Sequence, residues 1–229
     1  MVELIDSILE QFILPVYAIT LLVALWRYPR YFESILKYFP ILLMYTLLTE
    51  LLGYIIKWNE EYDFVLSDVL EYNNWVIYNI YDIIFFLYFL YVYWLSINSK
   101  SIRNFIRIAG IVVIIASVIN LFTSDFRIRF QMITYFTGAF MLIICIVLYF
   151  RHLRSKNGSW FIQTNLLSWL SIGILIFLAG YIPIIVLGHF NIVSGEDYQI
   201  IRRIHLMLIL IMNGCFIVGF IRVSRKSIN

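Results

Sequence analysis

Charged residues are scarce in this sequence. Only 14% of the 229 residues are Asp, Glu, Lys or Arg, whereas 62% are hydrophobic. A soluble domain has about 25% charged and about 45 to 50% apolar residues. A water-soluble fold has too little interior to bury so much apolar surface. The composition therefore excludes an ordinary soluble domain and favours a membrane protein.

Residues that hold metals, cofactors or phosphate groups are also few. The two cysteines, Cys145 and Cys215, fall within long apolar runs, so we expect reduced thiols and no loop disulfide. The three histidines are dispersed without metal-ligand spacing, and no Gly-rich phosphate loop occurs. The last apolar run lacks the Lys that a retinal pigment needs. We therefore expect no metal and no cofactor.

The apolar runs have the length that crosses a bilayer, because about 20 helical residues span the hydrocarbon core. Lipid-exposed backbone must satisfy its own hydrogen bonds, and these runs are too long and too uniformly apolar for barrel strands. Seven runs occur, at 8–26, 38–56, 74–97, 105–123, 131–150, 165–187 and 200–221. The sequence predicts an all-α bundle of seven transmembrane helices, in one integral membrane domain over 1–229. The first and fourth runs are the weakest, because charged residues lie near their starts.

The placement of Lys and Arg indicates an orientation, since cytoplasmic loops are enriched in both. With the N-terminus outside, 12 of the 17 basic residues fall in cytoplasmic segments, and the loop after the second run is acidic. The twelve are Arg27, Arg30, Lys37, Lys100, Arg103, Arg107, Arg151, Arg154, Lys156, Arg222, Arg225 and Lys226. We predict an outer N-terminus and a cytoplasmic C-terminus. Short basic clusters between apolar runs indicate orientation and do not favour nucleic acid as a partner.

Two carboxyl groups lie deep in apolar runs. Glu50 belongs to the second run and Asp82 to the third, and a charge at such depth costs at least about 2.5 to 3.5 kcal/mol. At about 1.5 Å rise per residue, both lie roughly 9 to 12 Å below the predicted outer boundary. The sequence therefore predicts that the two carboxyl groups are level and share one site.

Further polar residues share helical faces with these carboxyls or lie at similar depth. Tyr78 and Asn79 precede Asp82 by four and three residues, and a polar stripe follows one face of the last run. We predict an outward-facing cavity between the second, third and seventh spans, which binds a small solute or lipid. The predicted ligand-binding residues are Glu50, Asp82, Asn79, Tyr78, Arg202, His205 and Asn213. The alternative is that they only form interhelical hydrogen bonds or a buried ion pair.

Two stretches resemble a family of small seven-span bacterial membrane proteins. They are YFPILLMYTLLTELLGYII (Tyr38–Ile56) and YNIYDIIFFLYFLYVYW (Tyr78–Trp94). An acidic residue in the second span and a polar, aromatic third span recur in that family. The resemblance implies seven spans and a multi-pass protein of the bacterial inner membrane, and it implies no activity.

The preferred functional hypothesis is a receptor-like or sensor-like protein, because the ionisable groups lie in the outer halves of the spans. Its basic inner loops would contact a cytoplasmic signalling partner or anionic lipid headgroups. A proton-coupled small-molecule transporter is the alternative, since a carboxyl without a cation favours its neutral form and can exchange a proton. An intramembrane enzyme or membrane-acting effector is the third hypothesis. We assign no catalytic residue, because an enzyme would rest on Glu50 and Asp82 alone.

Overall fold

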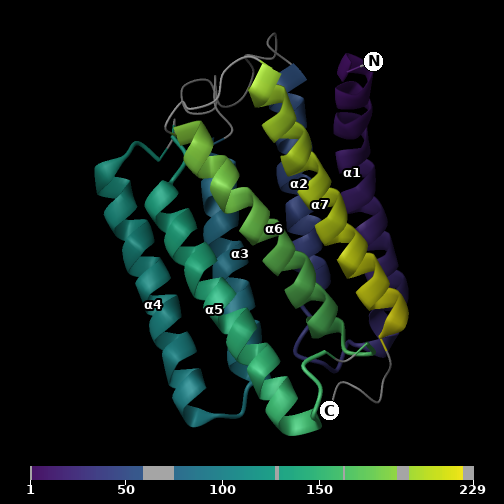
Figure 1. Cartoon of the computed structure of the whole chain (residues 1–229), viewed down its shortest axis with the longest axis vertical. Coiled ribbons are helices and arrows are strands. Elements are labelled where there is room, and N and C mark those ends of the chain that lie inside the picture. The colour runs from purple at the N-terminus through teal and green to yellow at the C-terminus, as the bar shows by residue number, and fades with distance from the viewer. Residues whose placement is uncertain (1, 59–74, 127–128, 162, 190–195, 224–229) are drawn as a thin grey trace. The chain divides into compact units, whose positions relative to one another are not determined.

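The computed structural model describes residues 2–58, 75–126, 129–161, 163–189 and 196–223, which form seven α-helices and one 3₁₀ helix (Figure 1). Each predicted apolar run overlaps one helix, which confirms the all-α class. The α-helices are α1 (Val2–Arg27), α2 (Phe39–Trp58), α3 (Trp75–Ser96), α4 (Lys100–Thr123), α5 (Met132–Asn157), α6 (Leu166–His189) and α7 (Glu196–Arg222), and the 3₁₀ helix is η1 (Tyr28–Arg30).

Six described segments are long and apolar enough to cross a membrane, and both weak runs are among them. The segments are Gln11–Arg30, Trp75–Ser96, Lys100–Thr123, Met132–Lys156, Leu166–Gly188 and Gln199–Arg222. Helix α2 contributes a shorter apolar stretch, Phe39–Ile55. The chain is therefore a multi-pass helical membrane protein. The seventh span and the outer N-terminus stay predictions.

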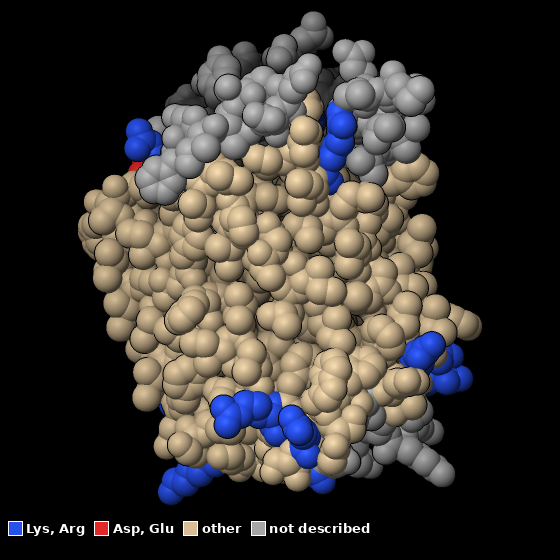
Figure 2. Space-filling model, in the orientation of Figure 1, with Lys and Arg blue, Asp and Glu red and all other residues tan. Residues whose placement is uncertain are grey.

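The surface of α4 shows the pattern of a lipid-exposed helix. Its exposed side is built from large apolar side chains such as Ile108, Ile111 and Phe122, the last of which is 86% exposed. Its buried side is narrow, with small or polar residues such as Ala109 and Asn120. Such a distribution is unfavourable in water and favourable in hydrocarbon. In Figure 2, most of the drawn surface is uncharged, and only a few Lys and Arg side chains are seen.

The chain divides into two compact units. Unit 1 comprises Met1–Leu43 and Asn157–Asn229, and thus holds α1, η1, the first turn of α2, α6 and α7. Unit 2 comprises Met44–Lys156, with the rest of α2 and helices α3, α4 and α5. A single integral membrane domain over 1–229 stays a prediction.

In unit 1, α6 and α7 form an antiparallel pair that packs closely at glycines. A Cβ atom added at Gly180 would lie 2.6 Å from Leu208 Cδ1, and one added at Gly219 would lie 2.7 Å from Trp169 Cβ. Small residues allow helix backbones to approach closely in membranes, where dispersion contacts drive helix association. The glycines therefore set the closeness of this helix pair.

Helices α1 and α7 of unit 1 run parallel, side by side (Figure 1). Thr20 Oγ1 donates a hydrogen bond to Asn213 Oδ1 at 3.0 Å, and Arg27 Nε donates one to the Phe220 carbonyl at 3.0 Å. On each helix the two contacting residues are seven positions apart, about two turns, so they lie on one face. Polar contacts therefore fix the relative register of the first and last helices.

In unit 2, α3 packs against α5 through aromatic rings. The Phe86 and Tyr135 ring centroids are 5.5 Å apart, and those of Tyr93 and Tyr149 are also 5.5 Å apart. Tyr93 and Phe86 are almost fully buried. Edge-to-face and tilted ring pairs of this kind add about 0.5 to 1.5 kcal/mol beyond burial. This packing holds α3 in place beside the polar residues of α2.

Candidate functional site

The polar residues of α2 meet those of α3 inside unit 2. Thr46 Oγ1 donates a hydrogen bond to Tyr81 Oη at 3.1 Å, and Tyr78 Oη donates one to Glu50 Oε2 at 3.5 Å. The later residue of α2 pairs with the earlier residue of α3, so the two helices run antiparallel here. Glu50 and Tyr78, both predicted site residues, are thus in contact.

Tyr81 lies at the centre of these contacts. Its ring centroid is 5.9 Å from that of Tyr45, and its phenol lies within electrostatic reach of both Glu50 and Asp82. We call this set the carboxyl–phenol cluster, and define it as Tyr45, Thr46, Glu50, Tyr78, Tyr81 and Asp82. The cluster brings two carboxyl groups, three phenols and one hydroxyl together between two apolar helices.

The two carboxyl groups of the cluster come from different helices. Glu50 of α2 contacts Tyr78, whereas Asp82 lies four residues beyond Tyr78 along α3. The equal depth of the two carboxyl groups in the membrane stays a prediction. Among the described residues, Asp82 accepts no hydrogen bond and forms no ion pair, and Glu50 is bonded to a hydroxyl group and to no Lys or Arg.

Sequence reasoning did not single out Tyr81 or Tyr45. The signal was present, because Tyr78, Tyr81 and Asp82 follow the i, i+3, i+4 spacing of one helix face. Tyr45 precedes Glu50 by five residues and is the neighbour of Thr46 in α2. Tyrosines at such positions in a Tyr-rich span also serve as interfacial anchors. Spacing alone did not distinguish the two roles.

Asn79 makes a different set of contacts. Its Nδ2 donates to the carbonyls of Phe126 and Arg129 at 3.0 and 2.9 Å, and its Oδ1 accepts from the Gln131 backbone N–H at 3.1 Å. The side chain is 1% exposed. These bonds use both amide protons and anchor the segment between α4 and α5. The contacts support a structural role for Asn79, and its predicted ligand-binding role stays a prediction.

The predicted residues of α7 lie in unit 1. The His205 ring stacks on Tyr181 of α6, with centroids 4.3 Å apart and planes 18° apart. Asn213 is fully buried, accepts from Thr20 and donates to the Ile209 carbonyl at 3.0 Å. Arg202 is half-buried near the start of α7. His205 and Asn213 thus contact neighbouring helices of their own unit.

The seven predicted site residues are divided between the two units. Glu50, Tyr78, Asn79 and Asp82 belong to unit 2, and the three α7 residues belong to unit 1. The structure brings Glu50, Tyr78 and Asp82 to one cluster and places Asn79 at the adjoining segment. A cavity that joins α2 and α3 to α7 stays a prediction.

The described residues contain no group of three or more His, Cys, Asp and Glu placed to hold a metal ion. Cys145 is buried in α5 and Cys215 is half-buried in α7, and both are free thiols. The cluster therefore offers carboxyl and hydroxyl oxygens and aromatic faces. Its chemistry suits binding of a hydrogen-bond donor or a cation, or holding a proton.

Comparison with protein-family models, curated proteins and solved structures finds no match to the chain. The resemblance of Tyr38–Ile56 and Tyr78–Trp94 to small seven-span bacterial membrane proteins stays a prediction.

Proposed function

We propose that this chain is a receptor-like or sensor-like membrane protein that binds a small solute at the carboxyl–phenol cluster. One observation carries the proposal. Glu50 and Asp82 lie around the same phenol, Tyr81, on two apolar helices, and neither carboxyl is bonded to a Lys or Arg of the described chain. A carboxyl group within an apolar span lowers the stability of the protein in the membrane, and ionisable residues at such positions usually mark functional sites.

The cluster has the groups that recognise an organic cation. A carboxylate forms a charge-assisted hydrogen bond with an ammonium group, and the faces of tyrosine rings attract cations by about 0.5 to 2 kcal/mol. Tyr45, Tyr78 and Tyr81 supply such rings next to the carboxyls. A small solute with one ammonium group and an apolar body therefore matches the cluster better than an anion does.

The position of the cluster favours sensing over transport. Asp82 lies seven residues beyond Trp75, the first residue of α3, which is about 10 Å along the helix. A transporter site is expected near the bilayer midplane with access from both sides. Under the predicted orientation, the cluster lies in the outer half of a cell membrane, which we propose is the bacterial inner membrane. The basic inner helix ends would contact a cytoplasmic signalling partner.

A proton-coupled transporter is the second candidate, and two observations favour it. The carboxyl of Glu50 is bonded to the hydroxyl of Tyr78, so it can hold or release a proton without breaking an ion pair. Pro15 and Pro183 lie inside α1 and α6. Proline removes a backbone hydrogen bond within a helix and provides a position for bending.

Binding and flux experiments test the proposal together. Purified protein in lipid nanodiscs is titrated with a panel of primary and quaternary ammonium compounds, and Glu50→Gln and Asp82→Asn are compared with wild type. We expect at least a tenfold loss of affinity in both variants. Glu33→Gln, which removes an exposed carboxyl outside the cluster, is the matched control and should bind like wild type.

Proteoliposomes then separate the two candidates. A receptor binds the ammonium compound without moving it across the bilayer, whereas a transporter accumulates it when a proton gradient is imposed. Gradient-driven uptake that Glu50→Gln abolishes would replace the sensor by the transporter. If wild-type protein binds no compound of the panel, or if both cluster variants bind as wild type does, the assigned site is wrong.

A further inference from the structure

One end of unit 1 is built around five packed aromatic rings. The ring centroids of Tyr31 and Phe220 are 5.5 Å apart, those of Phe39 and Phe220 are 5.9 Å apart, and those of Phe39 and Phe216 are 5.7 Å apart. Tyr28 packs edge-on against Tyr31 at 5.4 Å. We call Tyr28, Tyr31, Phe39, Phe216 and Phe220 the aromatic knot. It joins the α1–α2 connection to the last turns of α7.

Hydrogen bonds make the aromatic knot rigid. Tyr31 is 1% exposed, and its Oη donates to the Ala24 carbonyl at 2.8 Å. Arg27 donates to the carbonyls of Phe220 and Ile221, at the C-terminal end of α7. A cation at that end also offsets the negative end of the helix dipole. The connection between α1 and α2 is therefore held firmly on α7.

Three cations lie on aromatic rings around this knot. The Arg27 guanidinium is 5.3 Å from the Trp26 ring centroid, Lys37 Nζ is 4.9 Å from that of Tyr38, and the Arg222 guanidinium is 5.6 Å from that of Trp169. Trp26 is 70% exposed and Tyr38 is 52% exposed. The Trp26 and Tyr38 rings therefore face the surroundings of the protein.

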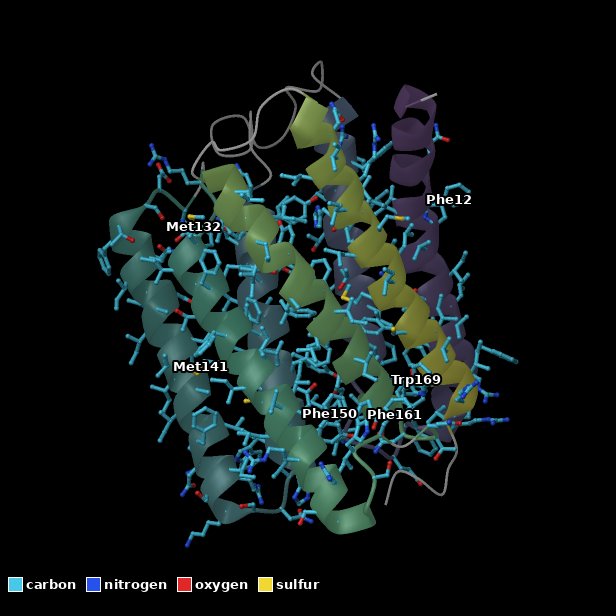
Figure 3. The ribbon with its side chains drawn as sticks, in the orientation of Figure 1. Phe12, Met132, Met141, Phe150, Phe161 and Trp169 are labelled. Atoms are coloured by element: carbon cyan, nitrogen blue, oxygen red, sulfur yellow. The ribbon has the colours of Figure 1, made fainter. Side chains whose placement is uncertain are left out.

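Arg222 is held by a small group on α6 and the segment before it. Its Nη1 donates to Gln163 Oε1 at 3.2 Å, and Trp169 Nε1 donates to the Gln163 carbonyl at 2.8 Å. Phe161 packs edge-on against Trp169 at 5.1 Å, and both are labelled in Figure 3. The Arg222 side chain is therefore oriented by its neighbours while it remains exposed.

The charge of this end is strongly positive. Its described residues, 26–39, 158–161, 163–169 and 216–223, carry four cations and one carboxylate. The cations are Arg27, Arg30, Lys37 and Arg222, and the carboxylate is that of Glu33. Arg27 is occupied by the α7 carbonyls, whereas Arg30, Lys37 and Arg222 are exposed. We call Trp26, Arg30, Lys37, Tyr38 and Arg222 the basic-aromatic surface.

We infer that the basic-aromatic surface binds the phosphate headgroup of an anionic phospholipid. Tryptophan and tyrosine rings concentrate at the depth of lipid headgroups, and Lys and Arg extend to the same level. A guanidinium carries five N–H donors, so Arg222, which donates one to Gln163, can also donate to phosphate oxygens. This surface adjoins α1, α6 and α7, and each of these helices contains a segment long and apolar enough to cross a membrane. Membrane lipids are therefore next to the surface. This binding is independent of any solute at the carboxyl–phenol cluster.

Native mass spectrometry of the detergent-solubilised full chain tests the inference. The protein is titrated with phosphatidylglycerol or phosphatidylcholine of the same acyl chains, and bound lipid is counted. Each surface cation contributes about 1 kcal/mol near an anionic lipid, or about fivefold in affinity. We expect preference for phosphatidylglycerol, and a loss on the order of a hundredfold when Arg30, Lys37 and Arg222 are all replaced by Gln.

A second triple variant is the matched control. Arg151, Arg154 and Lys156 are exposed at the end of α5, and among the described residues none lies over an aromatic ring. Their replacement by Gln removes the same charge and should lower phosphatidylglycerol affinity by less than about tenfold. Trp26→Leu and Tyr38→Leu, which keep every charge, should each weaken binding a few-fold.

Three results would overturn the inference. The first is equal loss in the two triple variants, which would show that net charge acts without the rings. The second is equal binding of the two lipids by wild type. The third is competition by soluble glycerol phosphate at the same concentration as the lipid, which would make the ligand a free phosphate compound. A variant that no longer folds is recognised by its circular dichroism, and the single Trp26→Leu and Tyr38→Leu variants then decide.

Discussion

Thr20 of α1 and Asn213 of α7 are 193 positions apart and share a buried hydrogen bond of 3.0 Å. Both side chains are fully buried. Thr20 Oγ1 also lies 2.8 Å from the Val16 carbonyl, so its one proton serves two acceptors. This contact joins the first and last helices of the chain within unit 1.

Thr20→Val should destabilise the protein, because it keeps the shape of the side chain and removes the donor to Asn213. Interhelical hydrogen bonds in membrane proteins contribute about 0.6 kcal/mol, with a maximum of about 1.7 kcal/mol. We expect a loss in this range in the free energy of unfolding, measured by denaturation in mixed micelles. Ser117→Ala, which removes a hydroxyl bonded only within α4 at 2.8 Å, should change it by less than about 0.5 kcal/mol. An unchanged Thr20→Val variant would contradict this account of the contact.

The helices were predictable from sequence, but this contact was not. Apolar runs of bilayer length are local features, so all seven helices follow from them. Asn213 was placed on a polar stripe of the last span, but its partner depends on which helix packs against that stripe. The same holds for Gly219. A side chain is excluded at this position by Trp169 on another helix, and no local motif indicates this contact.

Gly219→Ala should destabilise the α6–α7 pair. The new Cβ would lie 2.7 Å from Trp169 Cβ, an atom next to the backbone that cannot turn away. Overpacking of this kind costs about 1 to 3 kcal/mol. Gly214→Ala is the control on the same helix, because nothing lies within 4 Å of its new Cβ. Since alanine favours helix by up to about 1 kcal/mol over glycine, Gly214→Ala should be neutral or stabilising in the same unfolding assay.

Asn79→Ala should loosen the segment between α4 and α5. The change removes the acceptor for the Gln131 N–H and the donors to the Phe126 and Arg129 carbonyls. Buried backbone groups left without partners cost about 1 to 3 kcal/mol each before water replaces the bonds. Hydrogen–deuterium exchange should therefore increase at Gln131 in ligand-free protein. Protection equal to wild type would show that Asn79 does not anchor the segment.

Tyr31→Phe should lower the free energy of unfolding at neutral pH. It should also make that free energy fall less steeply as the pH rises above about 10. Burial raises the pKa of Tyr31, so its contribution is present below the unfolded pKa of about 10 and is lost as pH rises above it. Removing this group should reduce the alkaline slope by up to about 1.4 kcal/mol per pH unit. The lost bond to the Ala24 carbonyl costs about 1 kcal/mol at pH 7. An alkaline slope in Tyr31→Phe equal to that of wild type would refute the assignment.

The candidate site was predictable in part. Glu50, Tyr78 and Asp82 stand out because polar groups are rare in apolar runs, and the structure brings them together. Equal depth of the two carboxyls stays a prediction, because it was counted from predicted span ends. Which residue of α3 meets Glu50 was not predictable, because the contact with Tyr78 depends on the register of α2 against α3.

A solute that binds the carboxyl–phenol cluster must reach it from water. Labelling of an Asp82→Cys variant with an impermeant maleimide measures this access, in a background in which Cys145 and Cys215 are replaced by Ala. The maleimide reacts with the thiolate, and the thiolate forms only where water reaches the thiol. Ile84, two residues along α3 and 42% exposed on its apolar side, is the matched position. We expect the reagent to label Asp82→Cys from one side of the membrane and to leave Ile84→Cys unlabelled. Equal inertness of both positions would contradict this expectation.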